Sequence, residues 1–248
     1  MRFVARFVML AATAGTLALL RAGGAHAESA STECNAYFPL RPGARWVYTE
    51  GQRGSPAKMQ RTITVKSSTT HDGVTDAELM QEVTLPGEPG VVAGQAITKV
   101  RCDASGVTMW VDGSAGVAGE TSGVIKAKLP GLPPAKDLVP GFAWRGESEV
   151  ETMDAGTRVV ASGTRGSRVE GIESVTVPAG TFPEALRVAS VQTLTLRRGD
   201  EARYAKQQTL EWYVRGIGLV KRETRTSTGS DAAASIEELQ SYSGLETP

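Results

Sequence analysis

Reactive side chains are scarce in this sequence of 248 residues, which contains two histidines, His26 and His71, and two cysteines. His26 lies in an N-terminal segment that we expect to be removed, so a zinc site or a Ser-His-Asp triad would depend on His71 alone. His71 lies in THDGVTD, a pattern typical of an exposed hairpin turn. Neither a G-x-S-x-G motif nor a phosphate-binding P-loop is present. The sequence therefore predicts no metal, no cofactor and no catalytic residue.

An excess of charge of either sign is also missing. The chain has 27 basic and 27 acidic residues, and removal of Arg2, Arg6 and Arg21 leaves 24 basic residues against 27 acidic ones, a formal charge of −3. Nucleic acids and anionic membrane surfaces are bound largely through clustered Lys and Arg. The composition therefore gives no reason to expect either partner.

Cysteine occurs twice, at Cys34 and Cys102, and no C-x-x-C spacing is present. A redox-active pair is therefore disfavoured, whereas two thiols in an exported protein most simply pair with each other. We expect a structural disulfide between Cys34 and Cys102. By the chain-entropy model, a bridge that closes so long a loop contributes roughly 4 kcal/mol to stability.

A signal peptide accounts for the one long hydrophobic run. Arg2 and Arg6 precede the uncharged run 7–20, and the segment ends in Ala25-His26-Ala27. Fourteen residues fall short of the ~20 that a membrane-spanning helix needs. We therefore predict a signal peptide over residues 1–27, with Glu28 as the first mature residue.

Nothing in the remainder indicates an anchor. Cys34 follows Ser31, Thr32 and Glu33 rather than the small residues of a lipoprotein signal, and the C-terminal tail lacks a hydrophobic stretch. The expected location is the periplasm or the extracellular space, with no membrane span after cleavage. Residues 28–248 are enough for a single β-rich domain with a full core.

Short runs rich in Val, Thr and Ile alternate with polar residues and are separated by Gly, Pro, Asp and Ser, which predicts an all-β protein with antiparallel strands. The best helix candidate, Asp231–Leu239, overlaps one of the predicted strands. The predicted strands are 45–50, 59–67, 77–85, 95–102, 107–111, 124–129, 142–152, 157–170, 174–177, 185–197, 203–214, 219–228 and 236–242.

An internal repeat divides the chain. Leu40–Trp46 and Leu138–Trp144 share the pattern L-x-P-G-x-x-W and stand ninety-eight residues apart, each ahead of a predicted strand. The Pro-Gly pair favours a tight turn that delivers the Trp into the sheet. We interpret the chain as two similar halves, about 33–135 and 136–248. Chance similarity is the alternative for so short a pattern.

Three segments carry a family resemblance: YFPLRPGARWVY (37–48), VTVPAGTFPEALRV (175–188) and EWYVRGIGLVKRE (211–223). They resemble TapB-like exported bacterial β-proteins of unknown function, a set similar in pattern to LolA/LolB-like lipoprotein carriers. The resemblance implies a curved antiparallel sheet, a half-barrel or clam-like fold, with a hydrophobic concave face. It supplies no catalytic residues. The sequence shows no helical plug of the kind found in the carriers.

The aromatic side chains give the best candidates for a ligand site, because two apolar sheet halves can form a cleft between them. Core packing is the alternative role. The candidates are Trp46, Trp110, Trp144, Trp212 and Tyr213.

Three carboxylates, Glu147, Glu149 and Glu151, alternate along one predicted strand and so project from the same face. Such a set can hold Ca²⁺ or act as an acid/base pair on a sugar. The simpler interpretation is a solvated sheet face paired with neighbouring Arg or Lys.

The leading hypothesis is a non-enzymatic exported β-protein that binds either an apolar ligand, such as a lipid or another amphiphile, or an envelope protein. The alternatives are a hydrolase that acts through the carboxylates and a structural subunit of an envelope assembly.

Overall fold

The computed structural model describes residues 35–55, 58–85, 91–115, 123–154, 157–228 and 231–245. The signal-peptide prediction and Cys34 lie outside these ranges. Within them the chain forms twelve strands. Their bounds are β1 Arg45–Gln52, β2 Lys58–His71, β3 Val74–Thr84, β4 Val92–Asp103, β5 Gly106–Ala115, β6 Gly123–Pro130, β7 Ala143–Asp154, β8 Thr157–Val177, β9 Gly180–Arg198, β10 Glu201–Val214, β11 Gly218–Thr228 and β12 Asp231–Ser243.

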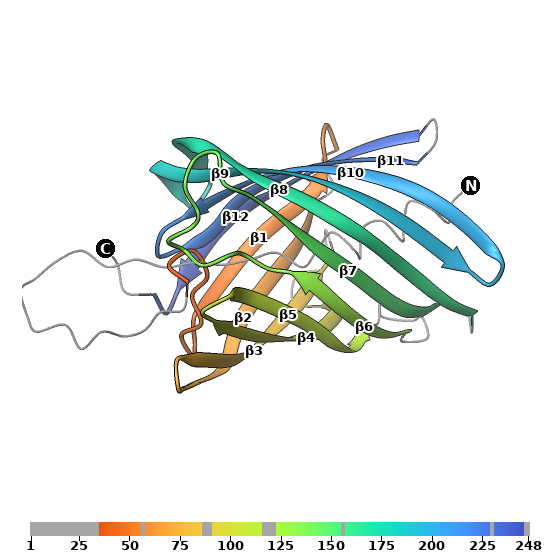
Figure 1. Ribbon diagram of the computed structural model, residues 1–248, viewed down its shortest axis with the longest axis horizontal. Helices are drawn as coiled ribbons and strands as arrows, with labels where there is room; N and C mark the ends of the chain where they lie inside the picture. Colours follow the sequence, from red (N-terminus) through yellow and green to blue (C-terminus); the bar gives the residue numbers. More distant parts are fainter. Residues whose placement is uncertain are drawn as a thin grey trace, which may run out of the picture.

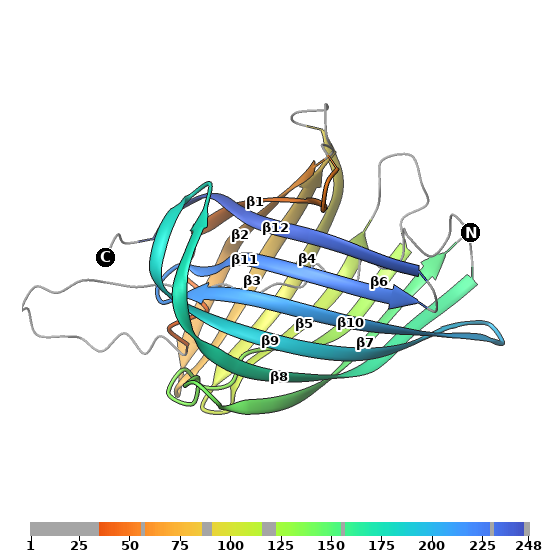
Figure 2. The same ribbon diagram turned by 90° about the horizontal axis from the view of Figure 1, so that it is seen from above.

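The strands form a closed antiparallel barrel, in which each strand pairs with its neighbours in the chain (Figures 1 and 2). Antiparallel pairing of β1 with β12, from Arg45 opposite Ser243 to Gln52 opposite Ser235, closes the ring. The all-β prediction is confirmed, but the half-barrel or clam-like prediction is wrong. A half-barrel would leave the backbone groups of β1 and β12 unpaired at two edges, and closure satisfies them.

Two local predictions also need correction. The separate strands 157–170 and 174–177 form one strand, β8, whose register shifts at two irregularities between Val169 and Val175. Bulges of this kind bend a strand without ending it. The helix candidate Asp231–Leu239 is entirely strand, because its alternating side chains are needed to close the barrel between β11 and β1.

Several chain segments cover one end of the barrel (left in Figure 1). The β8–β9 hairpin folds over it, where the Ala179 N–H donates to the Leu239 carbonyl at 3.0 Å. The segment before β1 reaches the same end, where the Gly216 N–H donates to the Ala36 carbonyl at 3.0 Å. The largest apolar and aromatic buried side chains lie toward this end: Phe38, Trp46, Tyr48, Ile63, Met109, Leu186, Tyr213, Leu219 and Leu239. We call it the filled end.

The two L-x-P-G-x-x-W segments make the same turn. The Ala44 N–H donates to Arg41, and the Phe142 N–H donates to Val139, at 3.0 Å in both cases. Gly43 and Gly141 follow the prolines with φ of 83° and 93°. Each turn then opens a run of six strands, β1–β6 and β7–β12.

The backbone hydrogen bonds around the two turns also correspond. The Gly43 N–H donates to Val65, and the Gly141 N–H donates to Val169, at 2.9 Å in both cases. Both turns belong to one barrel, and the interpretation of two similar halves stays a prediction.

We predict that Gly43→Ala and Gly141→Ala each lower the free energy of unfolding by about 1–2 kcal/mol, because a Cβ is disfavoured at positive φ. No atom lies within 4 Å of either added Cβ, so the cost is conformational rather than steric. Urea unfolding measures it. Gly171→Ala is the control, since its Cβ also meets nothing within 4 Å and its φ is not positive. Equal losses in all three variants would contradict the prediction.

Candidate functional site

The aromatic candidates do not form a single site. Trp46 and Tyr213 are buried in the filled end, and the Trp46 indole N–H donates to the Ile217 carbonyl at 2.8 Å. Trp144 points to the same side of the wall as the buried Ser167 and packs partly against the core, stacked on Phe142 at 5.9 Å. Trp46 and Tyr213 therefore act as packing groups, whereas Trp144 also lines a groove over β7, β8 and β9.

The other two aromatic candidates lie on the outer wall, on different strands. Trp110 of β5 is half-buried between Lys99 and Lys128 in the strand register. Trp212 of β10 is covered by Arg187 and Lys221, whose cationic groups lie 5.8 and 5.1 Å from its ring.

Cys102 is fully buried on β4. Its predicted partner Cys34 lies outside the described residues, so the disulfide stays a prediction.

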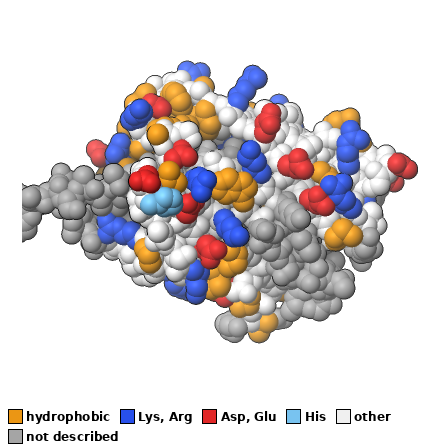
Figure 3. All heavy atoms as spheres, turned by 60° about the horizontal axis from the view of Figure 1, so that its bottom comes forward, with side chains coloured by type: hydrophobic (Ala, Val, Ile, Leu, Met, Phe, Trp, Pro, Cys, Tyr) orange, Lys and Arg blue, Asp and Glu red, His pale blue; other side chains and the backbone are white. Residues whose placement is uncertain are grey.

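The carboxylates Glu147, Glu149 and Glu151 share the outer face of β7, as the alternation predicts. Glu151 forms an ion pair with Arg158, at 2.7 Å between Oε2 and Nη2. Within the described ranges, no group of three or more His, Cys, Asp or Glu side chains could hold a metal ion. Basic and acidic side chains are interspersed over the face of the molecule seen in Figure 3.

Charged side chains inside the barrel form a feature that sequence reasoning missed. Arg222 of β11 lies between two carboxylates, with its Nε 2.9 Å from Glu211 and its Nη1 2.9 Å from Glu237. Arg61 of β2 pairs with Glu237, and Arg165 of β8 pairs with Glu211. We call Arg61, Arg165, Glu211, Arg222 and Glu237 the ionic belt.

Neutral polar groups extend the belt at both ends. Arg61 donates to Gln81 at 3.2 Å, and Gln81 donates to Thr98 of β4 at 2.8 Å. At the other end Arg165 donates to Ser190, and Ser190 donates to Ser167, both at 2.9 Å. The belt therefore connects β4 to β8 by way of the β1–β12 closure, and its ion pairs offset part of the cost of burying these charges.

The belt divides the interior into two parts. Along β10, Glu211 stands between Tyr213 on the filled side and Thr209 on the other side, and these inward residues alternate with outward ones. Beyond the belt, most of the buried inward side chains are small ones (Ser, Thr, Ala or Val), with one Leu and one Gln among them. They are Ser148, Thr152, Val159, Ala161, Leu194, Ala205, Gln207, Thr209, Thr224 and Thr226. We call this part the small-residue half.

Electrostatics within the belt favour the charged forms of its members. Burial by itself would raise the pKa of Glu211, but Arg165 and Arg222 outweigh it and hold that pKa below its usual value. Burial and the charge of Arg222 lower the pKa of Arg61 to about 10, which still leaves the guanidinium charged at neutral pH.

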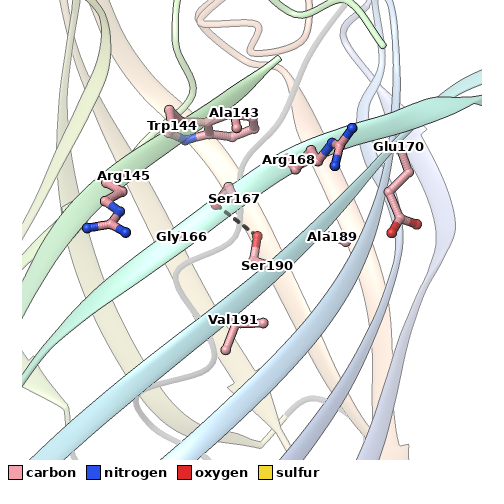
Figure 4. A pocket seen from close by; sticks show the side chains of 10 residues that line it. All are labelled: Ala143, Trp144, Arg145, Gly166, Ser167, Arg168, Glu170, Ala189, Ser190 and Val191. Atoms are coloured by element: carbon pink, nitrogen blue, oxygen red, sulfur yellow. Dashed lines mark hydrogen bonds between the residues drawn. The ribbon is translucent and has the colours of Figure 1, made fainter. Parts of the chain in front are cut away.

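A groove of about 540 Å³ crosses the outer wall over β7, β8 and β9 (Figure 4). Arg145 and Arg168 are exposed there, and Val191 is 43% exposed. The groove lies beside β7, whose described register with β6 is the shortest in the barrel and covers three residue pairs, Lys126–Lys128 opposite Glu151–Glu149. The stretch Ala143–Ser148 of β7 therefore has no partner from β6 in the described register.

Comparison with known proteins supports the fold. A family model described as DUF3108-like matches residues 145–239, which run from β7 into β12. None of the curated proteins matches the chain. No described helix is long and apolar enough to cross a membrane.

Two solved structures are similar. One is a protein from Bacteroides fragilis NCTC 9343, described as exported and with a YmcC-like fold, at 16% identity and a TM-score of 0.61, covering 84% of this chain and 98% of its own. The other, described as a lipoprotein of Parabacteroides distasonis ATCC 8503, has 18% identity and a TM-score of 0.61, covering 85% and 100%. Neither is described as TapB-like or LolA/LolB-like, so that finer resemblance stays a prediction. At these identities the likeness shows the fold alone.

We predict that Glu211→Gln lowers the free energy of unfolding at neutral pH by about 3 kcal/mol, because Arg165 and Arg222 lose a buried counter-charge. The folded-state pKa of Glu211 lies below the unfolded value, so its stabilisation is present above about pH 4.3 and is lost as the pH falls through the folded-state pKa. Denaturant unfolding between pH 7 and pH 3 should therefore show a shallower acid loss in the variant. The exposed Glu184→Gln is the control. A wild-type pH profile in Glu211→Gln would contradict the assignment.

Proposed function

We propose that this is a non-enzymatic exported binding protein that holds a ligand in the small-residue half of its barrel. The observation that carries the proposal is the change in side-chain size across the ionic belt. An eight-stranded barrel is just wide enough for its own side chains to fill, and the interior widens as strands are added. We therefore expect a twelve-stranded barrel, lined here mostly by Ser, Thr, Ala and Val, to have space for a ligand between these side chains.

The lining favours a ligand of mixed character. Ala161, Leu194 and Ala205 offer apolar surface, while Gln207 and Thr224 offer hydrogen-bonding groups. Ligand pockets commonly combine apolar walls with a few polar groups. A lipid or another amphiphile fits this description, and the filled end closes the chamber beyond the belt.

Two further considerations support the proposal. The signal-peptide pattern favours the periplasm or the extracellular space, and a protein of similar fold is described as exported. The belt carboxylates Glu211 and Glu237 are each engaged by two arginines, which leaves them poorly suited to proton transfer.

We predict that the wild-type mature protein, purified gently from the periplasm, carries an amphiphile that Ala161→Trp excludes. Ala161 is an inward residue of β8, so the indole would occupy the chamber. Native mass spectrometry with denaturing extraction measures the bound molecule. Ser162→Trp is the matched control, because the next residue is exposed on the outer wall.

The wild-type protein decides the outcome of this experiment. If wild type is free of ligand and binds no added amphiphile, the proposal fails. If Ala161→Trp does not fold, Thr226→Leu provides a smaller obstruction of the same chamber.

A second candidate function is docking of an envelope protein on the outer wall. The stretch Ala143–Ser148 of β7 has no β6 partner in the described register, so its free side can accept an added strand. The groove beside it presents Arg145 and Arg168, which form no ion pair with a described residue. The chemistry fits an extended acidic segment of a partner.

We predict that a photocrosslinker at Ala143 captures an envelope protein in cells and that Arg145→Glu with Arg168→Glu reduces the capture at least tenfold, through charge repulsion. Arg101→Glu, at an exposed position on β4, is the control for altered net charge. Capture that is equally strong in both variants would contradict this candidate.

A further inference from the structure

Glu50 is a buried carboxylate of β1 that forms no hydrogen bond or ion pair with a described residue. Its side chain points into the barrel on the same side of β1 as Trp46 and Tyr48, and it is 7% exposed. A buried carboxylate without hydrogen bonds is costly, and such groups are uncommon in folded proteins.

The position of Glu50 places it beside the ionic belt. In the β1 register it stands opposite Glu237 on one side and Met59 on the other. Along β1, Tyr48 lies on the filled side, where its hydroxyl donates to the Leu219 carbonyl at 2.9 Å. Glu50 is two residues further from the filled end and therefore borders the small-residue half.

The arginines nearby are already committed to other groups. Arg61 pairs with Glu237 and donates to Gln81, and Arg222 pairs with Glu211 and Glu237. Glu50 influences both arginines through space, since its charge raises the pKa of each against the effect of burial.

Three arginines and three glutamates meet here, counting the belt and Glu50. The two oxygens of Glu50 keep their acceptor capacity open.

We propose that Glu50 is the headgroup-binding residue of the chamber and that the ligand carries a primary ammonium group. This inference rests on the proposed function. An ammonium group offers three N–H donors and a charge opposite to that of Glu50, and charge-assisted hydrogen bonds are roughly twice as strong as neutral ones. A carboxylate or phosphate headgroup would instead meet Glu50 and Glu237 with like charge.

The test compares three probes of equal chain length, n-octylammonium, 1-octanol and octanoate, at submicellar concentration. Isothermal titration calorimetry with the full mature chain measures their affinities. We expect octylammonium to bind roughly tenfold more tightly than octanol, since one charge-assisted hydrogen bond is of the order of a tenfold change in Kd. Octanoate should bind most weakly.

In Glu50→Gln the preference for octylammonium over octanol should fall to about one, while octanol binding is retained. Glu78→Gln is the matched control, because Glu78 is exposed on the outer wall of β3. It should keep the wild-type preference. If Glu50→Gln does not fold, Glu50→Asp keeps the charge but shortens its reach, and an intermediate preference is expected.

Equal binding of all three probes by wild type, or an unchanged preference in Glu50→Gln, would overturn the role of Glu50 and leave the chamber in place. Failure of every probe to bind would overturn the proposed function itself.

Discussion

Pairing of β1 with β12 is the constraint on which the rest of the molecule depends. It converts two potential sheet edges into a continuous ladder, so the described strands form a ring rather than an open sheet. Closure also creates an interior that twelve strands make wide. The molecule fills that interior unevenly, with aromatic and long apolar side chains at one end and small side chains at the other.

The ionic belt lies at the boundary between these two parts, and it bears directly on closure. Glu237 of β12 pairs with Arg61 of β2 and Arg222 of β11, so one carboxylate connects strands on both sides of the β1–β12 junction. Buried ion pairs contribute little net stability over apolar packing, but removing one partner is costly. A belt of this kind therefore favours one strand arrangement over alternatives in which the charges would be left without partners.

The two halves of the chain contribute to this interior in different ways. The turns at Gly43 and Gly141 are equivalent in hydrogen bonding and open equivalent runs of strands. The long β8–β9 hairpin, by contrast, extends only from the second half and covers the filled end (Figure 2). Similar turns thus precede β1 and β7, while β8 and β9 alone supply this covering hairpin.

Local sequence was sufficient to predict most strands and turns, because the alternation of apolar and polar residues and the turn-forming Gly and Pro residues act over a few positions. It determined the all-β class, most of the strands and the turn that opens each six-strand run. It did not determine closure, which depends on contact between residues almost two hundred positions apart, such as Trp46 and Tyr242.

The candidate site could not be found from sequence for the same reason. In the sequence, nothing distinguishes Glu211, Arg222 and Glu237 from the ordinary polar residues of an alternating strand. The alternation does not indicate which face of the strand becomes the interior of the barrel. The tertiary structure decided that their face is the inner one. It also separated the aromatic residues, placing Trp46 inside and Trp212 on the outer wall, because a strand's two faces become interior and exterior only when the sheet closes.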